Sequence, residues 1–190
     1  MELSPMLNYW RESSPRRKRL LTIVAAFVLS FAVTVSGVLT PLSQNEAQDL
    51  SHDLEQTQVD LENTTLLSGS LFIFRNNFII TMIMFVPLAG PFFSVYVMHN
   101  TGVVIAAESV AASTHPSPLL VLLLLFLFPF AWLEFLAYSL AFSESIWLMW
   151  RLIKRRGAEE LVNALIMLLA CLGILLAAAI IEMAFILALV

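Results

Sequence analysis

Charged residues are scarce in this chain, and their scarcity excludes most classes of water-soluble protein. Asp, Glu, Lys and Arg make up 13% of the 190 residues, whereas 59% are hydrophobic and the mean hydropathy is +0.87. A soluble globular domain carries about 25% charged residues, roughly twice this fraction. Several apolar runs reach the length of about 20 residues that a bilayer crossing needs. The composition therefore predicts an all-α, polytopic bundle of transmembrane helices.

Several sets of catalytic and metal-binding residues are also missing. Cys171 is the only cysteine, which excludes an intrachain disulfide and a cysteine cluster for a metal. No Asp follows Asp60, and neither His-Glu-x-x-His nor Gly-x-Ser-x-Gly occurs. The three histidines, His52, His99 and His115, are scattered along the chain. We therefore expect no catalytic residues, no metal and no cofactor, and we expect the lipid bilayer rather than nucleic acid as a partner.

The basic residues form two clusters, with Arg75 as the exception. One cluster lies within residues 11–19 and the other within residues 151–156, and each precedes a long apolar run. Cytoplasmic flanks of membrane proteins carry the excess of Lys and Arg, so both clusters are predicted on the cytoplasmic side. The chain must then cross the membrane an even number of times between them. We predict a multi-pass cell-membrane protein of about five spans, with a cytoplasmic N-terminus and an extracytoplasmic C-terminus.

The predicted organisation has six parts along the chain. They are a basic cytoplasmic tail (1–19), a first span (20–40), an acidic extracytoplasmic segment (41–70), a core membrane bundle (71–150), a basic cytoplasmic loop (151–160) and a C-terminal span (161–190). The core would hold three spans, one of them continuous over 119–150. Pro and Gly predict a turn at 87–91 or near 99–102, and whether 91–113 crosses fully or is re-entrant stays open.

The segment 41–70 is the one polar region between predicted spans. It holds six acidic residues and no Lys or Arg, in agreement with an extracytoplasmic position. A narrow apolar stripe recurs every three or four positions, as in an amphipathic helix, at Ala47, Leu50, Leu54, Thr57 and Leu61. We predict a helix over 43–68 that either packs on its own membrane domain or docks a protein partner.

Polar residues inside the predicted spans are the candidate functional residues, because charged groups in a bilayer usually face a bundle interior or water. Arg75, Asn76 and Asn77 lie at the start of the second span. The two amides either cap a helix at the interface or hydrogen-bond to another span. Glu134 lies about mid-span, shortly after Pro129, and is either a neutral acid bonded between helices or part of a polar pocket. Arg75 is its available cationic partner.

Weaker candidates add polarity elsewhere in the core. His99, Asn100 and Glu108 form a secondary polar set in the third span. Glu144 is expected in water near the inner interface. Glu182 is expected in the bundle or at the outer interface.

Three motifs occur in order in the core: Ile73-Phe74-Arg75-Asn76-Asn77, Asn100-Thr101-Gly102 and Pro129-Phe130-Ala131-Trp132-Leu133-Glu134. Over residues 71–145 the chain resembles the stage II sporulation protein M family, whose members carry an N-terminal anchor, paired Asn residues, an Asn-Gly and a Pro-His-Gly-x-x-Glu motif. By this resemblance Asn76, Asn77 and Glu134 take the family's motif positions. The chain departs from the pattern at Phe130 and Ala131, where the family has His and Gly, and by an insertion in Asn100-Thr101-Gly102.

The resemblance implies an architecture more than an activity. The family's namesake looks like a membrane scaffold that joins cell-wall hydrolases during engulfment in spore-forming bacteria. We prefer a non-enzymatic scaffold that recruits partners. A small transporter or channel is the alternative, with Glu134, Asn76 and Asn77 lining its site and a homodimer as its expected form. An intramembrane enzyme is the third hypothesis.

Overall fold

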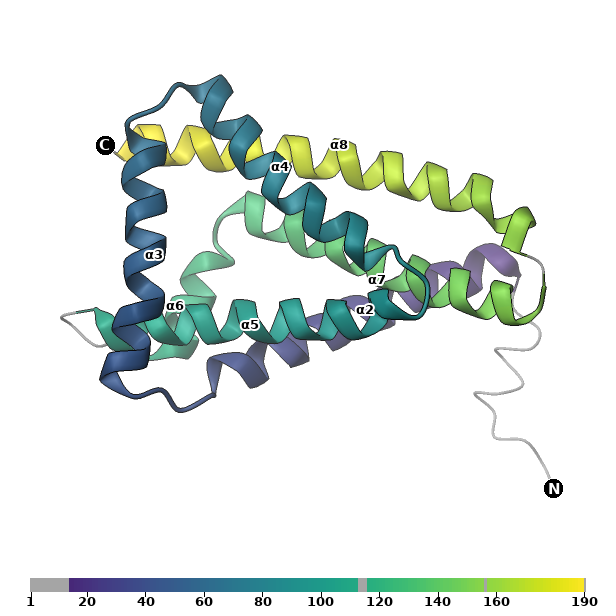
Figure 1. The fold of residues 1–190 in the computed structure, drawn as a ribbon, viewed down its shortest axis with the longest axis horizontal. Helices are drawn as coiled ribbons and strands as arrows, with labels where there is room; N and C mark the ends of the chain where they lie inside the picture. The colour runs from purple at the N-terminus through teal and green to yellow at the C-terminus, as the bar shows by residue number, and fades with distance from the viewer. Residues whose placement is uncertain (1–13, 113–115, 156, 190) are drawn as a thin grey trace.

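The computed structural model describes residues 14–112, 116–155 and 157–189, and all regular structure in these ranges is helical. The predicted all-α class is therefore confirmed. Arg11, His115 and Arg156 of the sequence argument lie outside the described residues. The helices, shown in Figure 1, are α2 Pro15–Val38, α3 Gln44–Glu62, α4 Leu66–Met84, α5 Ala89–Ala111, α6 Pro118–Leu125, α7 Pro129–Ile153 and α8 Gly157–Leu189.

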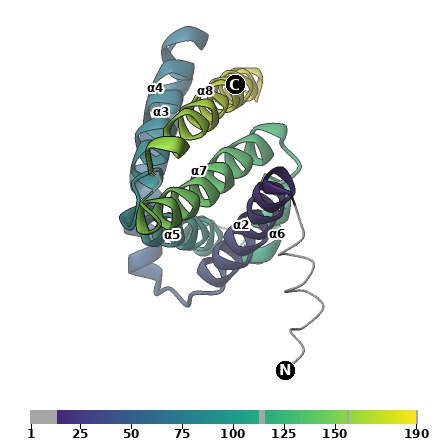
Figure 2. The same cartoon turned by 90° about the vertical axis from the view of Figure 1, so that its right-hand side faces the viewer.

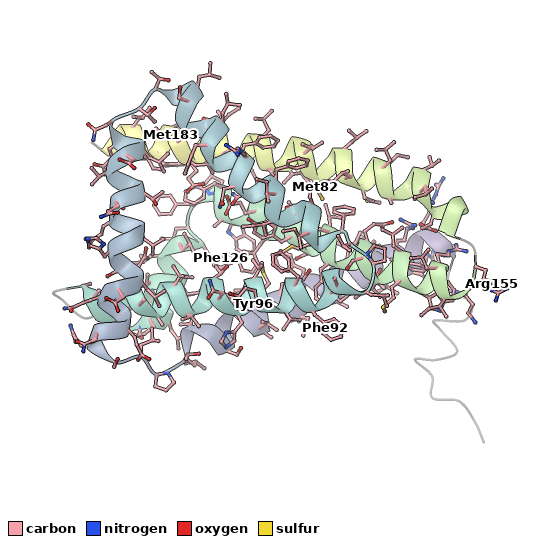
Figure 3. All side chains as sticks on the ribbon, in the orientation of Figure 1. Met82, Phe92, Tyr96, Phe126, Arg155 and Met183 are labelled. Carbon is pink, nitrogen blue, oxygen red and sulfur yellow. The ribbon has the colours of Figure 1, made fainter. Side chains whose placement is uncertain are left out.

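The long helices α2, α4, α5, α7 and α8 run along the molecule, and α3 stands across one end of them (Figure 1). The helix α7 lies in the middle, with α8 on one side and the pair α2 and α5 on the other (Figure 2). The start of α2 and the connection from α7 to α8 lie at the end remote from α3. Arg155 lies at this end and Met183 at the opposite one (Figure 3). We call the two ends the basic end and the α3 end.

Three helices are long and apolar enough to cross a membrane, within residues Arg16–Val38, Leu66–Met84 and Glu160–Ala188. The helices α6 and α7 pass the same test as a pair, although the chain bends by 91° between them. The described residues thus hold three candidate spans, or four if the bent pair counts as one. The helix α5 has 23 residues but is not among them. Length and composition support a membrane protein, and the count of about five spans stays a prediction.

The span predicted over 119–150 is not one unbroken helix, because the chain breaks between Leu125 and Pro129, and it stays a candidate span only as a bent pair. Pro lacks an N–H and is favoured in the first helical turn, so Pro129 begins α7 instead of kinking it. Aromatic packing holds the bend: the Phe126 ring centroid lies 5.0 Å from that of Trp132 and 4.9 Å from that of Phe135. Trp132 Nε1 also donates to the Phe126 carbonyl at 2.7 Å.

By contrast, residues 91–111, where a re-entrant path was left open, belong to one continuous helix.

Side-chain caps place the boundary between α3 and α4 earlier than predicted. Ser43 and Glu46 form a capping box at the start of α3. The helix ends at Glu62, and the Thr65 side chain caps α4 by accepting from the Ser68 N–H. The helix predicted over 43–68 is therefore shorter at its C-terminal end, and residues 66–68 belong to α4. As a consequence the Asn pair lies near the middle of α4, and the alternative of a helix cap at 76–77 is wrong.

The apolar stripe of α3 also differs from the predicted one. Ala47 and Leu61 are buried, whereas Leu50 and Thr57 are exposed. Ser51 is buried in their place. The helix packs on α5 and, over a smaller contact, on α8. A short helix lying across the end of a bundle needs only this narrow contact line, so most of its surface stays free.

Two glycines bring the backbones of α2 and α5 into contact. A Cβ atom added at Gly102 would lie 2.1 Å from the Thr34 carbonyl oxygen and 2.9 Å from Gly37 Cα. A Cβ added at Gly37 would lie 2.0 Å from the His99 carbonyl oxygen. Small residues permit such close helix crossings in membranes. Gly102 of the Asn-Thr-Gly motif thus has a packing role. The turn before α5 falls at the first of the two predicted places, where Leu88 has a φ of 69°.

Candidate functional site

The two strongest sequence candidates, Asn77 and Glu134, are hydrogen-bonded to each other. The Asn77 amide Nδ2 donates to Glu134 Oε1 at 2.5 Å, which links the middle of α4 to the first turns of α7. Asn77 is 9% exposed and lies on the buried face of its helix with Ile73 and Thr81. The helix α7 begins at the exposed Pro129 and enters the packed helices within its first two turns. Glu134 therefore sits within the packed helices although it is close to the helix start.

Glu182 of α8 completes this arrangement, because its carboxyl group is hydrogen-bonded to that of Glu134. The buried phenol of Tyr138 lies one helical turn after Glu134 and within electrostatic range of both acids. We call Asn77, Glu134, Tyr138 and Glu182 the carboxyl cluster. It joins α4, α7 and α8 through polar contacts in an apolar bundle.

Arg75 and Asn76 do not take part in the carboxyl cluster. Both side chains are exposed, and among the described residues the structure records no ion pair between Arg75 and Glu134. Successive residues on a helix point about 100° apart. When Asn77 faces the bundle, Arg75 and Asn76 therefore point away from it. The sequence left open whether Arg75 meets Glu134, and the structure does not bring the two side chains together. Within the carboxyl cluster the Asn77 amide provides the donor for Glu134 instead.

The secondary polar residues lie apart from one another and from the cluster. His99 and Asn100 are exposed on α5. Glu108, also exposed, lines a cavity of about 340 Å³ between α5 and α3, together with Ser51 and Glu55. Glu108 therefore marks the junction of α3 with the bundle, and the structure does not gather the three secondary residues into one site.

A second buried polar group lies at the basic end, and the sequence argument missed it. Arg19 of α2 forms ion pairs with Glu144 of α7, at 2.9 Å, and with Glu160 of α8. Arg151 Nε lies 3.1 Å from the second oxygen of Glu160. Glu144 and Glu160 are 3% and 1% exposed. The expectation that Glu144 is in water is wrong, because a cation from the first helix covers it.

This ion-pair network fixes the ends of α2, α7 and α8 relative to one another. The Arg19 guanidinium also lies 5.5 Å from the Trp147 ring centroid. Breaking a buried pair by removing one partner costs about 3–5 kcal/mol, because a charge is left buried and uncompensated. Arg19 and Arg151, one from each basic cluster, therefore stabilise the fold through these ion pairs.

One of the two missed members of the carboxyl cluster, Glu182, had a signal in the sequence. Glu182 is a single acid late in a long apolar helix, and ionisable residues within membranes usually pair with one another. Two such acids, Glu134 and Glu182, on different helices were therefore candidates for a pair. The role of Tyr138 had no comparable signal, since an apolar packing position suits it equally well.

The two positions where the chain departs from the motif lie in an apolar environment. The Phe130 ring lies 5.5 Å from that of Phe128 and 6.3 Å from that of Phe185. Ala131 is buried. A histidine and a glycine at these positions would face aromatic rings and packed helix, so the substitutions extend the apolar core beside Glu134.

A protein-family model, described as Stage II sporulation protein M, matches residues 20–186 of the chain. No curated protein matches it, and no solved structure matches it. The family match covers α3 and the whole carboxyl cluster, and it begins one residue after Arg19 of the ion-pair network.

Proposed function

Because the chain belongs to the stage II sporulation protein M family, we propose that it is a non-enzymatic membrane scaffold that holds partner proteins through α3. The polar groups of the bundle support this function, because they are bonded to one another. Carboxyl bonds to carboxyl and amide in the middle, and arginine pairs with glutamate at the basic end. Such contacts stabilise a helix bundle. They leave the exposed side of α3 as the polar surface that a partner protein can contact.

The observation that carries this proposal is a hollow on the outward face of α3. It has a volume of about 340 Å³ and is lined by His52, Glu55, Gln56, Val59 and Asp60. All five side chains are exposed, and Val59 stands 54% exposed between acids. An apolar anchor surrounded by charge is the pattern of a protein-binding surface with a polar rim. The occupant that fits it is a protein with a basic contact surface.

Membrane orientation supports the same proposal. We place five passes in the bilayer, formed by α2, α4, α5, the bent α6–α7 pair and α8, with both basic clusters in the cytoplasm. This places α3 and the C-terminus outside the cytoplasm. The position of α3 across one end of the bundle, with Arg155 at the other end, agrees with this orientation.

A site-specific photo-crosslinker in living cells tests the docking surface. The reactive group at position 56, inside the hollow, should give one adduct of defined mass, and Asp60→Lys should abolish it because a basic partner would be repelled. Asp49→Lys is the matched control, since Asp49 is exposed on α3 but does not line the hollow. Equal loss with both substitutions would show a general effect of charge. Absence of any adduct at 56 would count against the scaffold.

The carboxyl cluster favours a transporter or channel as the second candidate. Asn77, Glu134 and Glu182 bring an amide and two carboxyl groups together between three helices inside the bundle, and ionisable residues in such a place form the proton relays of carriers. A bundle this small would act as a homodimer. Proton flux into liposomes separates the two functions. Flux that Glu134→Gln abolishes, with folding retained, would favour transport, and no flux above empty liposomes would favour the scaffold.

A further inference from the structure

A cavity of about 460 Å³ lies between α2 and α7 at the basic end. Its walls are largely apolar, with Ile146, Trp147, Trp150 and Ile153 on the α7 side and Lys18 and Thr22 on the α2 side. Trp150 is 46% and Ile153 68% exposed, so the cavity opens at the outer surface of the bundle. It involves neither the carboxyl cluster nor α3.

Hydrogen bonds and ring contacts hold the aromatic wall of this cavity in place. Trp147 Nε1 donates to Thr22 Oγ1 at 2.8 Å, which fastens the indole of α7 to α2. The Trp147 and Trp150 ring centroids lie 5.7 Å apart in an edge-to-face arrangement. The Arg151 guanidinium lies 5.6 Å from the Trp150 ring. A wall fixed from several sides needs little ordering when a ligand enters, so the site is preformed.

The exposed charged side chains that the structure describes around the cavity are basic. Arg16 and Arg17 are exposed on the preceding turn of α2, and Lys154 and Arg155 are exposed at the end of α7. The buried glutamates of this end are paired with Arg19 and Arg151. The surface around the opening is therefore cationic, with Lys18 at the cavity itself.

An apolar cavity beneath a cationic rim fits a ligand with an anionic head and a hydrocarbon tail. A soluble anion would leave the apolar walls without contact, and a neutral lipid would make no use of the basic rim. Basic pockets between transmembrane helices bind anionic lipid head groups, and Trp is enriched where the head groups begin.

We propose that this cavity is a binding site for one anionic phospholipid, with an acyl chain against Trp147, Trp150 and Ile146 and the phosphate at Lys18. The bound lipid lies in the seam between α2 and α7 and holds the first helix to the bundle. It also ties the basic end to the anionic leaflet, independently of any partner on α3.

Tryptophan quenching by brominated lipid tests the site in the full chain. The sequence has four Trp residues, and Trp10→Phe with Trp132→Phe leaves the two in the cavity wall as reporters. The protein is reconstituted in phosphatidylcholine vesicles with a minor fraction of brominated phosphatidylglycerol or of brominated phosphatidylcholine. We expect stronger quenching by brominated phosphatidylglycerol at equal fractions. Unchanged far-ultraviolet circular dichroism verifies the fold of the reporter protein.

Two single-charge variants separate a site from general surface attraction. Removing the one basic residue that contacts the phosphate of a bound lipid costs about 1 kcal/mol, which is about fivefold in binding. Lys18→Gln should therefore weaken the preference for phosphatidylglycerol about fivefold, whereas Lys154→Gln, exposed at the same end but outside the cavity, should leave it nearly unchanged. Equal losses in both variants would overturn the proposal.

Two further arms test the tail and the head of the ligand. Ile146→Phe fills the cavity and should reduce quenching by both brominated lipids. Unchanged quenching in this variant would show that no acyl chain enters. Soluble glycerol phosphate should not compete with brominated phosphatidylglycerol, and competition would show a site for a free phosphate instead of a lipid. Equal quenching by the two lipids in the unsubstituted reporter would also refute the proposal.

Discussion

Replacing Gly102 by Ala tests whether the backbones of α2 and α5 are in contact. The new Cβ would lie 2.1 Å from the Thr34 carbonyl oxygen, whereas ordinary contacts of a Cβ begin at 3.4 Å. The obstructing atoms belong to the backbone, so one helix must move by about 1 Å. A gap of about 0.5–1 Å along the crossing removes about a quarter to a half of the dispersion energy of each atomic contact. Overpacking of this kind costs about 1–3 kcal/mol.

Gly173→Ala is the matched control, because a Cβ there meets nothing within 4 Å. Both substitutions gain the same helix propensity of Ala, about 1 kcal/mol, so the difference between them isolates the crossing. Unfolding in mixed detergent micelles, followed by far-ultraviolet circular dichroism, should show Gly102→Ala less stable than the control by about 1–3 kcal/mol. Adding Gly37→Ala should cost less than the sum of the single variants, since separated helices accommodate both methyl groups. Equal stability of Gly102→Ala and the control would refute the close crossing.

Three more predictions concern the polar contacts. Asn77→Ala leaves a buried carboxyl oxygen without its donor and should destabilise the protein by about 1–3 kcal/mol in thermal unfolding, whereas Asn76→Ala on the exposed face should stay within about 0.5 kcal/mol; similar losses would contradict the carboxyl cluster. Glu160→Gln removes the ion-pair partner of two arginines and should cost about 3–5 kcal/mol in the same assay, and a loss below that of Asn77→Ala would disprove the buried network. The hydrogen bonds from Ser43 lower the pKa of Glu46, so its capping contribution is complete above the ordinary pKa and is lost as the pH falls through the lowered one. Ser43→Ala should move the midpoint of this titration, followed by NMR of the Glu46 carboxyl, to higher pH, and an unchanged midpoint would exclude the capping box as the cause.

The sequence allowed the class of protein and the pairing of Asn77 with another span to be anticipated, for identifiable reasons. Apolar length and segregated charge are properties of the chain itself and need no tertiary information. A buried amide or carboxyl group in an apolar segment needs a hydrogen-bond partner inside the bundle. Asn77 and Glu134 are such partners for each other. Which residues meet depends on helix rotation, however. Arg75 lies two positions from Asn77 and faces away from Glu134.

The remaining features depend on tertiary contacts that periodicity does not encode. The sequence predicts an interfacial position for Glu144. In the structure Arg19, which is distant in the sequence, covers its carboxylate. In the sequence, Pro129 indicates only a kink in a long apolar run. In the structure the chain bends by 91° there, and the Phe126 ring packs on two other rings at the bend. Gly102 is one glycine among several in the sequence, and only the crossing with α2 distinguishes it.

The orientation of α3 relative to the basic end is the central claim, because docking outside the cytoplasm depends on it. Single cysteines at positions 56 and 154, in a Cys171→Ala background, place one thiol on the exposed face of α3 and one at the basic end. A membrane-impermeant maleimide applied to intact cells should label position 56, and it should label position 154 only after the membrane is permeabilised. Labelling of position 154 in intact cells, or protection of position 56, would contradict the account.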